Sequence, residues 1–107
     1  MFEACHVEEF AQDTLLAGLV LDNCHGITVQ GSAFSSWGRK GATSIKLING
    51  TTDCMILPNY HAAVSIAVSV DNTCSGNVIY AQPQYNSGKP VTRGKLVVDR
   101  SKNRVIE

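Results

Sequence analysis

The sequence predicts an all-β fold in which short strands stack as successive coils of a solenoid. Three observations lead to this prediction. Apolar residues come in short runs that alternate with polar residues at the period of a strand. Polar bends of five or six residues separate these runs. The unit of run, bend and run recurs along the chain, and such recurrence is typical of stacked repeats.

The clearest unit lies within Gly18–Phe34. Its two apolar runs, Leu19–Leu21 and Ile27–Val29, are too short for helices. The bend between them, Asp22–Gly26, contains Asn, which tolerates left-handed backbone angles, and Gly, which has no Cβ to clash. No two-residue Asn-Gly or Asp-Gly turn joins the runs, so we expect the chain to turn a corner here rather than form a simple hairpin.

Further strands follow from the same pattern. We expect strands or apolar runs at residues 4–10, Leu15–Leu21, Ile27–Val29, Ser44–Ile48, Cys54–Leu57, Val64–Val70, Asn77–Tyr80, Leu96–Val98 and Val105–Ile106. A helix over Val7–Leu21 is an alternative because several of its residues have tolerable helix propensity. The absence of an N-cap and the β-rich sequence that follows favour a strand. Ser35–Thr43, rich in Gly and Ser, is expected to be a loop.

Aligning the bends gives the repeat. Steps between equivalent positions run from 21 residues (Ile45 to Ile66) to 28 residues (Ile27 to Met55). About four coils are therefore expected over residues 1–85, followed by a C-terminal hairpin or extended arm at residues 86–107. The alignment predicts two lines of stacked side chains: asparagines at one edge (Asn23, Asn49, Asn72) and cysteines near the core (Cys24, Cys54, Cys74).

Charge is unevenly distributed although the formal net charge is zero. Residues 1–25 carry five acids and no Lys or Arg. Residues 86–107 carry six bases against Asp99 and Glu107. One interpretation is that the two charged segments are solvated ends of opposite sign. The other is that the basic segment contacts an acidic surface on this chain, on a neighbouring subunit or on a partner. The tail has no aromatic interleaving, so a nucleic acid is not expected as a partner.

Length and composition limit the number of domains and the class of protein. With 107 residues and 44% hydrophobic content, the chain is one domain or part of one. The N-terminus has neither the charged nor the apolar region of a signal peptide, and no apolar run approaches the roughly 20 residues that span a bilayer.

Adjacent residues on a strand point to opposite faces, which opposes shared metal ligation by Cys5-His6 or Cys24-His25. No metal or other cofactor is expected, and the thiols are expected to be buried.

The stretch GLVLDNCHGITVQGSAF, with SIKLING and NVIYAQPQ, resembles coils of the right-handed parallel β-helix of pectate-lyase-like proteins, and more narrowly of phage tailspikes and tail appendages. The resemblance covers about residues 2–85 and lies in the style of the repeat. It implies a homotrimer in the virion tail that binds, and often cleaves, host-surface polysaccharide. Members of this family have many more coils, so the chain is expected to be a fragment or the last coils of one.

Two kinds of site follow as candidates. Polysaccharide hydrolysis needs two carboxylates about 5–10 Å apart, and Glu8 with Asp22, or Glu8 with Asp13, are the candidate catalytic residues. A lyase needs a base together with a cation, and Arg39 and Lys40 form the only basic pair in the repeat region. No catalytic motif of the family is present, so an enzyme, either a lyase or a glycoside hydrolase, is the alternative rather than the leading hypothesis.

Sugar binding requires fewer specific residues than catalysis, because an aromatic face and a few polar groups suffice. The candidate binding residues are Trp37, Tyr60, His61 and Tyr85. These side chains have a structural alternative, since aromatics at coil ends also stack on one another or cover the core. The leading hypothesis is a structural, trimer-forming segment of a glycan-binding tail protein. A weaker one is a folding module whose arm (residues 86–107) brings three chains into register.

Overall fold

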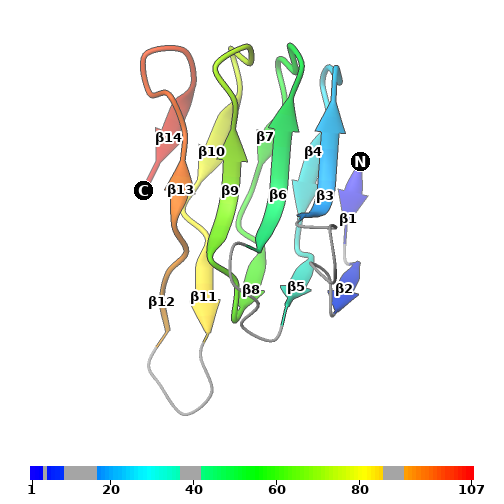
Figure 1. The fold of residues 1–107 in the computed structure, drawn as a ribbon, viewed down its shortest axis with the longest axis vertical. Helices are drawn as coiled ribbons and strands as arrows, with labels where there is room; N and C mark the ends of the chain where they lie inside the picture. Colours follow the sequence, from blue (N-terminus) through cyan, green and yellow to red (C-terminus); the bar gives the residue numbers. More distant parts are fainter. Residues whose placement is uncertain (4, 9–16, 37–41, 86–90) are drawn as a thin grey trace.

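The computed structural model spans residues 1–107, and the structure describes residues 1–3, 5–8, 17–36, 42–85 and 91–107 (Figure 1). Parallel sheets stack as a β-solenoid, which confirms the predicted all-β parallel β-helix. The stack makes about three turns, whereas the sequence predicts about four. The helix considered over Val7–Leu21 does not form in its described parts, because His6–Glu8 and Ala17–Asp22 are strands. The described residues contain no helix long and apolar enough to cross a membrane.

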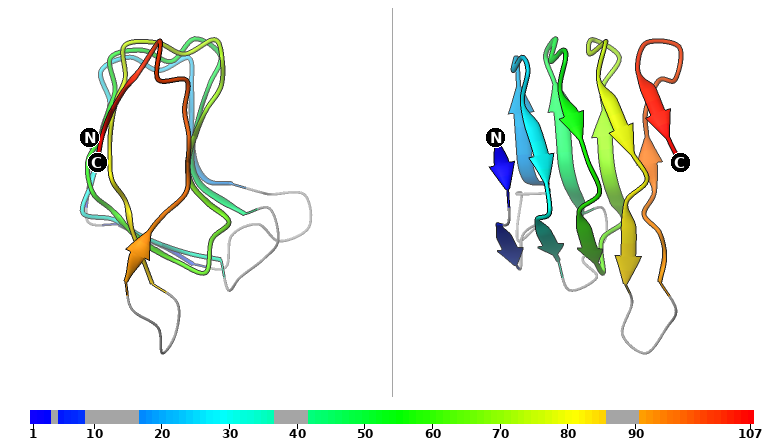
Figure 2. Two further views of the ribbon diagram at one scale, coloured as in Figure 1. Left: turned by 90° about the vertical axis from the view of Figure 1, so that its left-hand side faces the viewer. Right: turned by 180° about the vertical axis from the view of Figure 1, so that it is seen from behind.

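Each coil visits three sheets in the same order. Sheet A contains β1 (Phe2–Glu3), β4 (Thr28–Gln30), β7 (Met55–Ile56), β10 (Val78–Tyr80) and β14 (Arg104–Ile106). Sheet B contains β2 (His6–Glu8), β5 (Ala33–Ser35), β8 (Tyr60–Ala62), β11 (Pro83–Tyr85) and β12 (Thr92–Arg93). Sheet C contains β3 (Ala17–Asp22), β6 (Thr43–Ile48), β9 (Ile66–Val70) and β13 (Leu96–Val97). In cross-section, sheets A and C form the long sides, sheet B closes one end, and the turns from sheet C to sheet A close the other (Figure 2).

The register between coils differs from the sequence alignment. Ile45 pairs with Val68 rather than with Ile66, and Met55 pairs with Thr28. Strand alternation repeats every two residues, so the shift of two in sheet C keeps every apolar side chain on the same face. The shift of one in sheet A instead places Met55 level with Thr28, and Met55 is exposed whereas Ile27 packs against the core. Hydrophobic periodicity therefore predicts the coil but leaves its register open.

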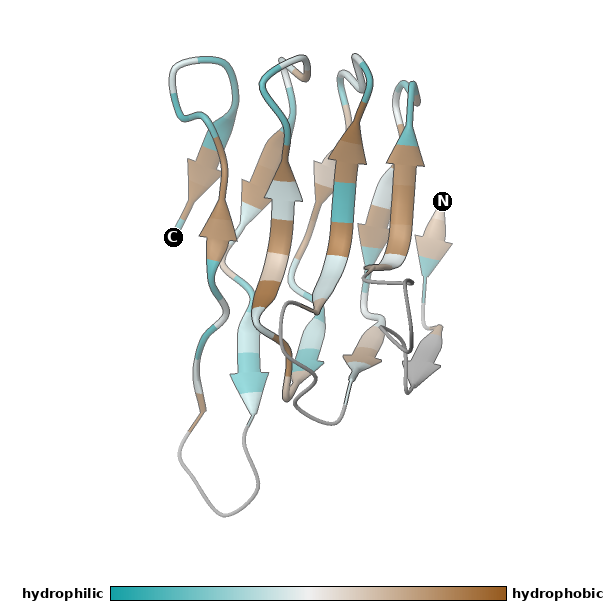
Figure 3. Cartoon of the chain, viewed as in Figure 1, coloured by the Kyte–Doolittle hydropathy of each residue, from teal (hydrophilic) through white to brown (hydrophobic). Residues whose placement is uncertain are grey.

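The core is a column of apolar side chains enclosed by the three sheets. Sheets A and C supply most of the fully buried aliphatic residues, including Val29, Ile56, Ile79, Ile45, Leu47 and Val68. Brown, hydrophobic segments accordingly run along most strands of these two sheets, while the corners are teal (Figure 3). Phe34 of sheet B stacks between Phe2 and His61, with ring centroids 6.3 and 5.5 Å away.

Buried amide side chains connect the coils at the corner between sheets A and B. The oxygen of each accepts a hydrogen bond from the backbone N–H of the preceding coil: Asn59 Oδ1 from Ser32 (2.9 Å) and Gln82 Oε1 from Asn59 (3.1 Å). Both amides are fully buried. The chain turns at this corner, so backbone groups leave the sheet ladder, and the amides satisfy them.

A second ladder lies where sheet A begins. Asn77 Oδ1 accepts from Cys54 N (2.9 Å), and Asn103 Oδ1 accepts from Asn77 N (3.1 Å). The Asn77 amide also donates to Thr51 O and to Asn103 Oδ1. These inward-facing residues are the asparagine ladder of the stack.

The asparagine line predicted at the edge is confirmed in position, because Asp22 pairs with Ile48 and Leu47 pairs with Val70, so Asn23, Asn49 and Asn72 follow at equivalent places in successive coils. Asn23, Asn49 and Asn72 are exposed at the corners between sheets C and A. Asn23 and Asn49 have φ of 52° and 53°, so their role is to turn the chain, and Asn49 Nδ2 donates outward to Asp22 Oδ1.

The predicted cysteine line is wrong in register, although the prediction of buried thiols is partly confirmed. Cys54 and Cys74 are buried, Cys24 is half-buried and Cys5 is exposed. Parallel bridges from His25 to Thr52 and from Thr52 to Ser75 place Thr51, rather than Cys54, between Cys24 and Cys74. All four thiols are free.

Residues 91–107 contribute strands to all three sheets. β12 pairs antiparallel with β11, while β13 and β14 extend sheets C and A in parallel. A hairpin arrangement of β11 with β12 is thus present, whereas Leu96–Val97 and Arg104–Ile106 join different sheets. Gly94 lets β12 pass close to the stack, because a Cβ there would lie 2.7 Å from the Ala67 Cβ. A domain boundary at residue 85 stays a prediction.

Candidate functional site

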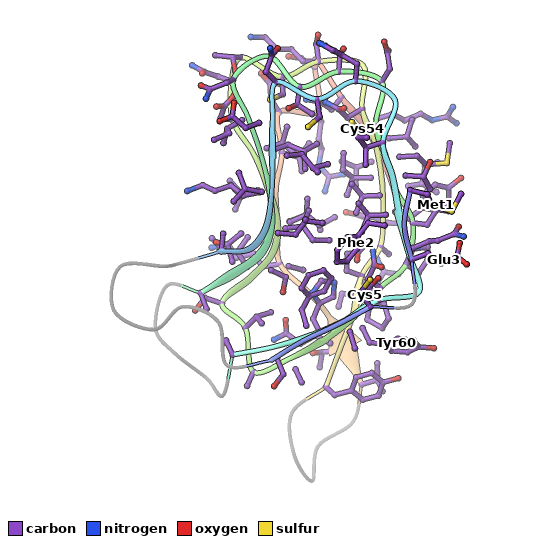
Figure 4. The ribbon with its side chains drawn as sticks, turned by 90° about the vertical axis from the view of Figure 1, so that its right-hand side faces the viewer. Met1, Phe2, Glu3, Cys5, Cys54 and Tyr60 are labelled. Carbon is purple, nitrogen blue, oxygen red and sulfur yellow. The ribbon has the colours of Figure 1, made fainter. Side chains whose placement is uncertain are left out.

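The outer face of sheet B carries an exposed aromatic pair. Tyr60 begins β8 and Tyr85 ends β11, and strand alternation turns both side chains away from the core. His61 pairs with Gln84 and Ala62 with Tyr85, so the two tyrosines occupy diagonal positions on neighbouring strands. Their ring centroids are 5.9 Å apart, and the ring planes are inclined by 32° to each other. Tyr60 is 51% exposed and Tyr85 is 40% exposed. Figure 4 shows Tyr60 projecting outward from the stack.

A cation shares this face. Pro83 pairs with Arg93 of β12, and residues paired across two strands lie on the same side of the sheet. Pro83 precedes Tyr85 by two positions, so Arg93 and Tyr85 also belong to the same side. The Arg93 side chain is 73% exposed. The face therefore combines two aromatic rings with a guanidinium at its C-terminal edge.

His61 lies inside the stack, so its predicted place on the binding surface is wrong. It follows Tyr60 on β8 and consequently points to the opposite side of the sheet, where it is fully buried. Gln82 Nε2 donates to Leu57 O and Tyr80 O, which leaves Gln82 Oε1 to accept from His61 Nε2 at 2.8 Å. His61 Nδ1 is then the acceptor for Ser44 Oγ, also at 2.8 Å.

Burial keeps the imidazole of His61 neutral. Burial lowers the pKa of His61 from 6.5 to about 4, partly offset by the hydrogen bond with Gln82. A hydroxyl beside an imidazole is also an arrangement of nucleophilic catalysis. Ser44 and His61 are both fully buried, however, so no substrate reaches them and their role is structural.

The predicted carboxylate pair is not brought together. Glu8 ends β2 in sheet B, where its backbone pairs with Ser35. Asp22 ends β3 at the far corner, and β3 alone is about 20 Å long at ~3.3 Å per residue. Figure 1 shows β2 and the end of β3 at opposite ends of the coil. The side chain of Glu8 lies outside the described part of the structure, as do Asp13, Trp37, Arg39 and Lys40.

A pocket at the last coil contains residues that sequence reasoning missed. Its lining is Ala81, Gln82, Arg93, Gly94, Leu96, Arg100 and Glu107. Arg100 Nη2 donates to Glu107 Oε1 at 2.6 Å, and Arg93 Nη1 is 3.9 Å from Glu107 Oε2. Hydrogen bonding to Arg100 lowers the pKa of Glu107. The only sequence signal was the basic composition of residues 86–107, which cannot show that two arginines converge.

Among the described residues, no group of three or more His, Cys, Asp or Glu side chains is placed to hold a metal ion. The side chains that do converge are the tyrosines of sheet B and the charged residues of the pocket.

Comparison with known proteins adds no relative. No protein-family model matches the chain, and neither a curated protein nor a solved structure matches it. What the structure supports is the parallel β-helix fold itself.

Proposed function

We propose that this chain is a structural segment of a phage tailspike or tail appendage, forms a homotrimer in the virion tail, and offers a surface that binds host polysaccharide. The glycan-binding part rests on one observation, the exposed Tyr60–Tyr85 pair on the outer face of sheet B. The resemblance of the repeat supplies the biological setting.

Physical chemistry favours a sugar as the ligand of this pair. A tyrosine ring offers a flat apolar face for the C–H side of a pyranose and a hydroxyl for hydrogen bonding. The strands that hold the rings are paired on both sides, β8 with β5 and β11, and β11 with β8 and β12. Such a platform is ordered before the ligand arrives, so binding costs little conformational entropy.

Replacing either tyrosine with alanine is expected to weaken glycan binding at least tenfold, because the stacking surface is lost. Tyr60→Phe retains the ring and should lose less. The measurement is calorimetric titration of the chain with polysaccharide from a susceptible host. Val97→Ala is the matched control, since Val97 is similarly exposed (42%) on sheet C. Unchanged affinity in Tyr60→Ala and Tyr85→Ala would remove the basis of the proposed binding face.

The outer face of sheet A supports the proposed trimer. Met55 is 40% exposed there, and Leu57, Val78 and Tyr80 are only half-buried. A patch of exposed apolar side chains in the middle of a sheet is typical of a contact between subunits. Light scattering at high micromolar concentration should give the mass of three chains, and Met55→Glu should shift the mass toward that of one. A monomeric mass for the unmodified chain would contradict the trimer.

A further inference from the structure

The pocket at the last coil has the charge pattern of a carboxylate receptor. Its charged lining residues are Arg93, Arg100 and Glu107, so the two guanidiniums outnumber the acid. The other lining residues are uncharged. Guanidinium groups match a carboxylate in geometry as well as in charge, because their N–H donors form a planar fork.

The structure already contains a carboxylate in this place. Glu107 forms a short hydrogen bond with Arg100 but stays 3.9 Å from Arg93, so only one of the two arginines is fully engaged. The three side chains are 45–73% exposed. Exposed ion pairs contribute little to stability, so another carboxylate can replace Glu107 at small cost.

The pocket also adjoins the aromatic pair. Arg93 lines the pocket and, through its pairing with Pro83, shares the outer face of sheet B with Tyr85. A chain of sugars stacked on Tyr60 and Tyr85 thus runs toward Arg93 at the edge of the sheet.

We propose that Arg93 and Arg100 bind the carboxylate of an acidic sugar in a polysaccharide whose neighbouring ring stacks on Tyr60 and Tyr85, and that Glu107 occupies this place in the free protein as an internal competitor. This inference rests on the proposed glycan binding and narrows the ligand to polysaccharides that contain sugars with a carboxylate.

The test compares one glycan with and without its charge. The full chain is titrated with a hyaluronan oligosaccharide, with the same oligosaccharide after reduction of its carboxyl groups, and with free glucuronate. We expect the acidic oligosaccharide to bind at least tenfold more tightly than either of the other two. Free glucuronate binding as tightly as the oligosaccharide would overturn the proposal, because the aromatic pair would then contribute nothing.

Variants of the pocket give effects of opposite sign. Glu107→Gln removes the competitor and should raise affinity for the acidic oligosaccharide about three- to tenfold, without affecting the reduced one. Arg93→Gln and Arg100→Gln should each abolish most of the preference for the acidic form. Lys46→Gln is the matched control, because it also removes one exposed positive charge but lies on sheet C. Weaker or unchanged binding in Glu107→Gln would overturn the internal competition.

The two proposals fail in different ways. Loss of affinity for both oligosaccharides in Tyr60→Ala, with no effect of Arg93→Gln, would leave glycan binding in place and overturn the carboxylate site. Absence of binding to either oligosaccharide and to host polysaccharide would overturn both.

Discussion

Replacing Asn77 with alanine is expected to lower the free energy of unfolding by about 3–5 kcal/mol. Asn77 is fully buried, and its side chain accepts from Cys54 N and donates to Thr51 O and Asn103 Oδ1. Alanine leaves the Cys54 N–H without its acceptor, which costs roughly 1–3 kcal/mol for a buried group. It also removes two donated hydrogen bonds worth about 0.5–1.5 kcal/mol each, although Thr51 O still accepts from Ser75 N and Asn103 Oδ1 from the backbone N–H of residue 77. Because a domain of this size is stable by only about 5–15 kcal/mol, the variant should be close to unfolding.

Urea unfolding followed by circular dichroism measures this effect. Asn72→Ala is the matched control: Asn72 is exposed at a corner, and its removal should change stability by no more than about 0.5 kcal/mol. Equal losses for the two variants would contradict the assignment of the ladder to the buried residues, and a large loss in Asn72→Ala alone would favour the edge ladder that the sequence alignment predicts.

This pair of residues also shows where sequence reasoning succeeds and where it stops. Composition and alternation predict strands, corners and stacking, because these depend only on which residues are apolar and at what spacing. Aligning the polar bends places Asn72 correctly at the edge, level with Asn49, but it does not show that the buried ladder consists of Asn77 and Asn103. The buried ladder depends on which side chains point inward where the chain enters sheet A, and polar composition alone does not reveal this.

The candidate site, too, could be predicted only in part from the sequence. Tyr60 and Tyr85 are predicted binding residues, and the structure places them side by side on an exposed face. Tyr60 and His61 are both predicted for that surface, yet neighbours on one strand point to opposite sides, so at most one of them can face outward. Arg93, Arg100 and Glu107 come from β12, from a turn and from the end of the chain, and only the folded last coil brings them to one pocket.

Acidification from pH 6.5 to pH 4 is expected to destabilise the fold by about 3 kcal/mol through His61 alone. Burial lowers the pKa of His61 from 6.5 to about 4, so within this window the unfolded chain takes up a proton that the folded chain does not. The contribution is fully present above pH 6.5 and is lost at up to about 1.4 kcal/mol per pH unit on the way to pH 4. Below pH 4 both states are protonated, and the effect of His61 levels off.

His61→Gln separates this effect from other titrations. Glutamine retains an acceptor and a donor near Ser44 and Gln82 but does not titrate, so the variant is expected to be less stable at pH 7 and to lose much less stability between pH 6.5 and pH 4.5. His25→Gln is the control, because it makes the same substitution at an exposed histidine. The lowered pKa values of Asp71, Asp99 and Glu107 affect stability mainly below about pH 4.5, since the unfolded chain protonates these carboxyls around pH 3.8 and 4.5. A slope between pH 4.5 and 6.5 that persists in His61→Gln would contradict the neutral, hydrogen-bonded state of His61, and with it the view that this residue belongs to the core of the stack.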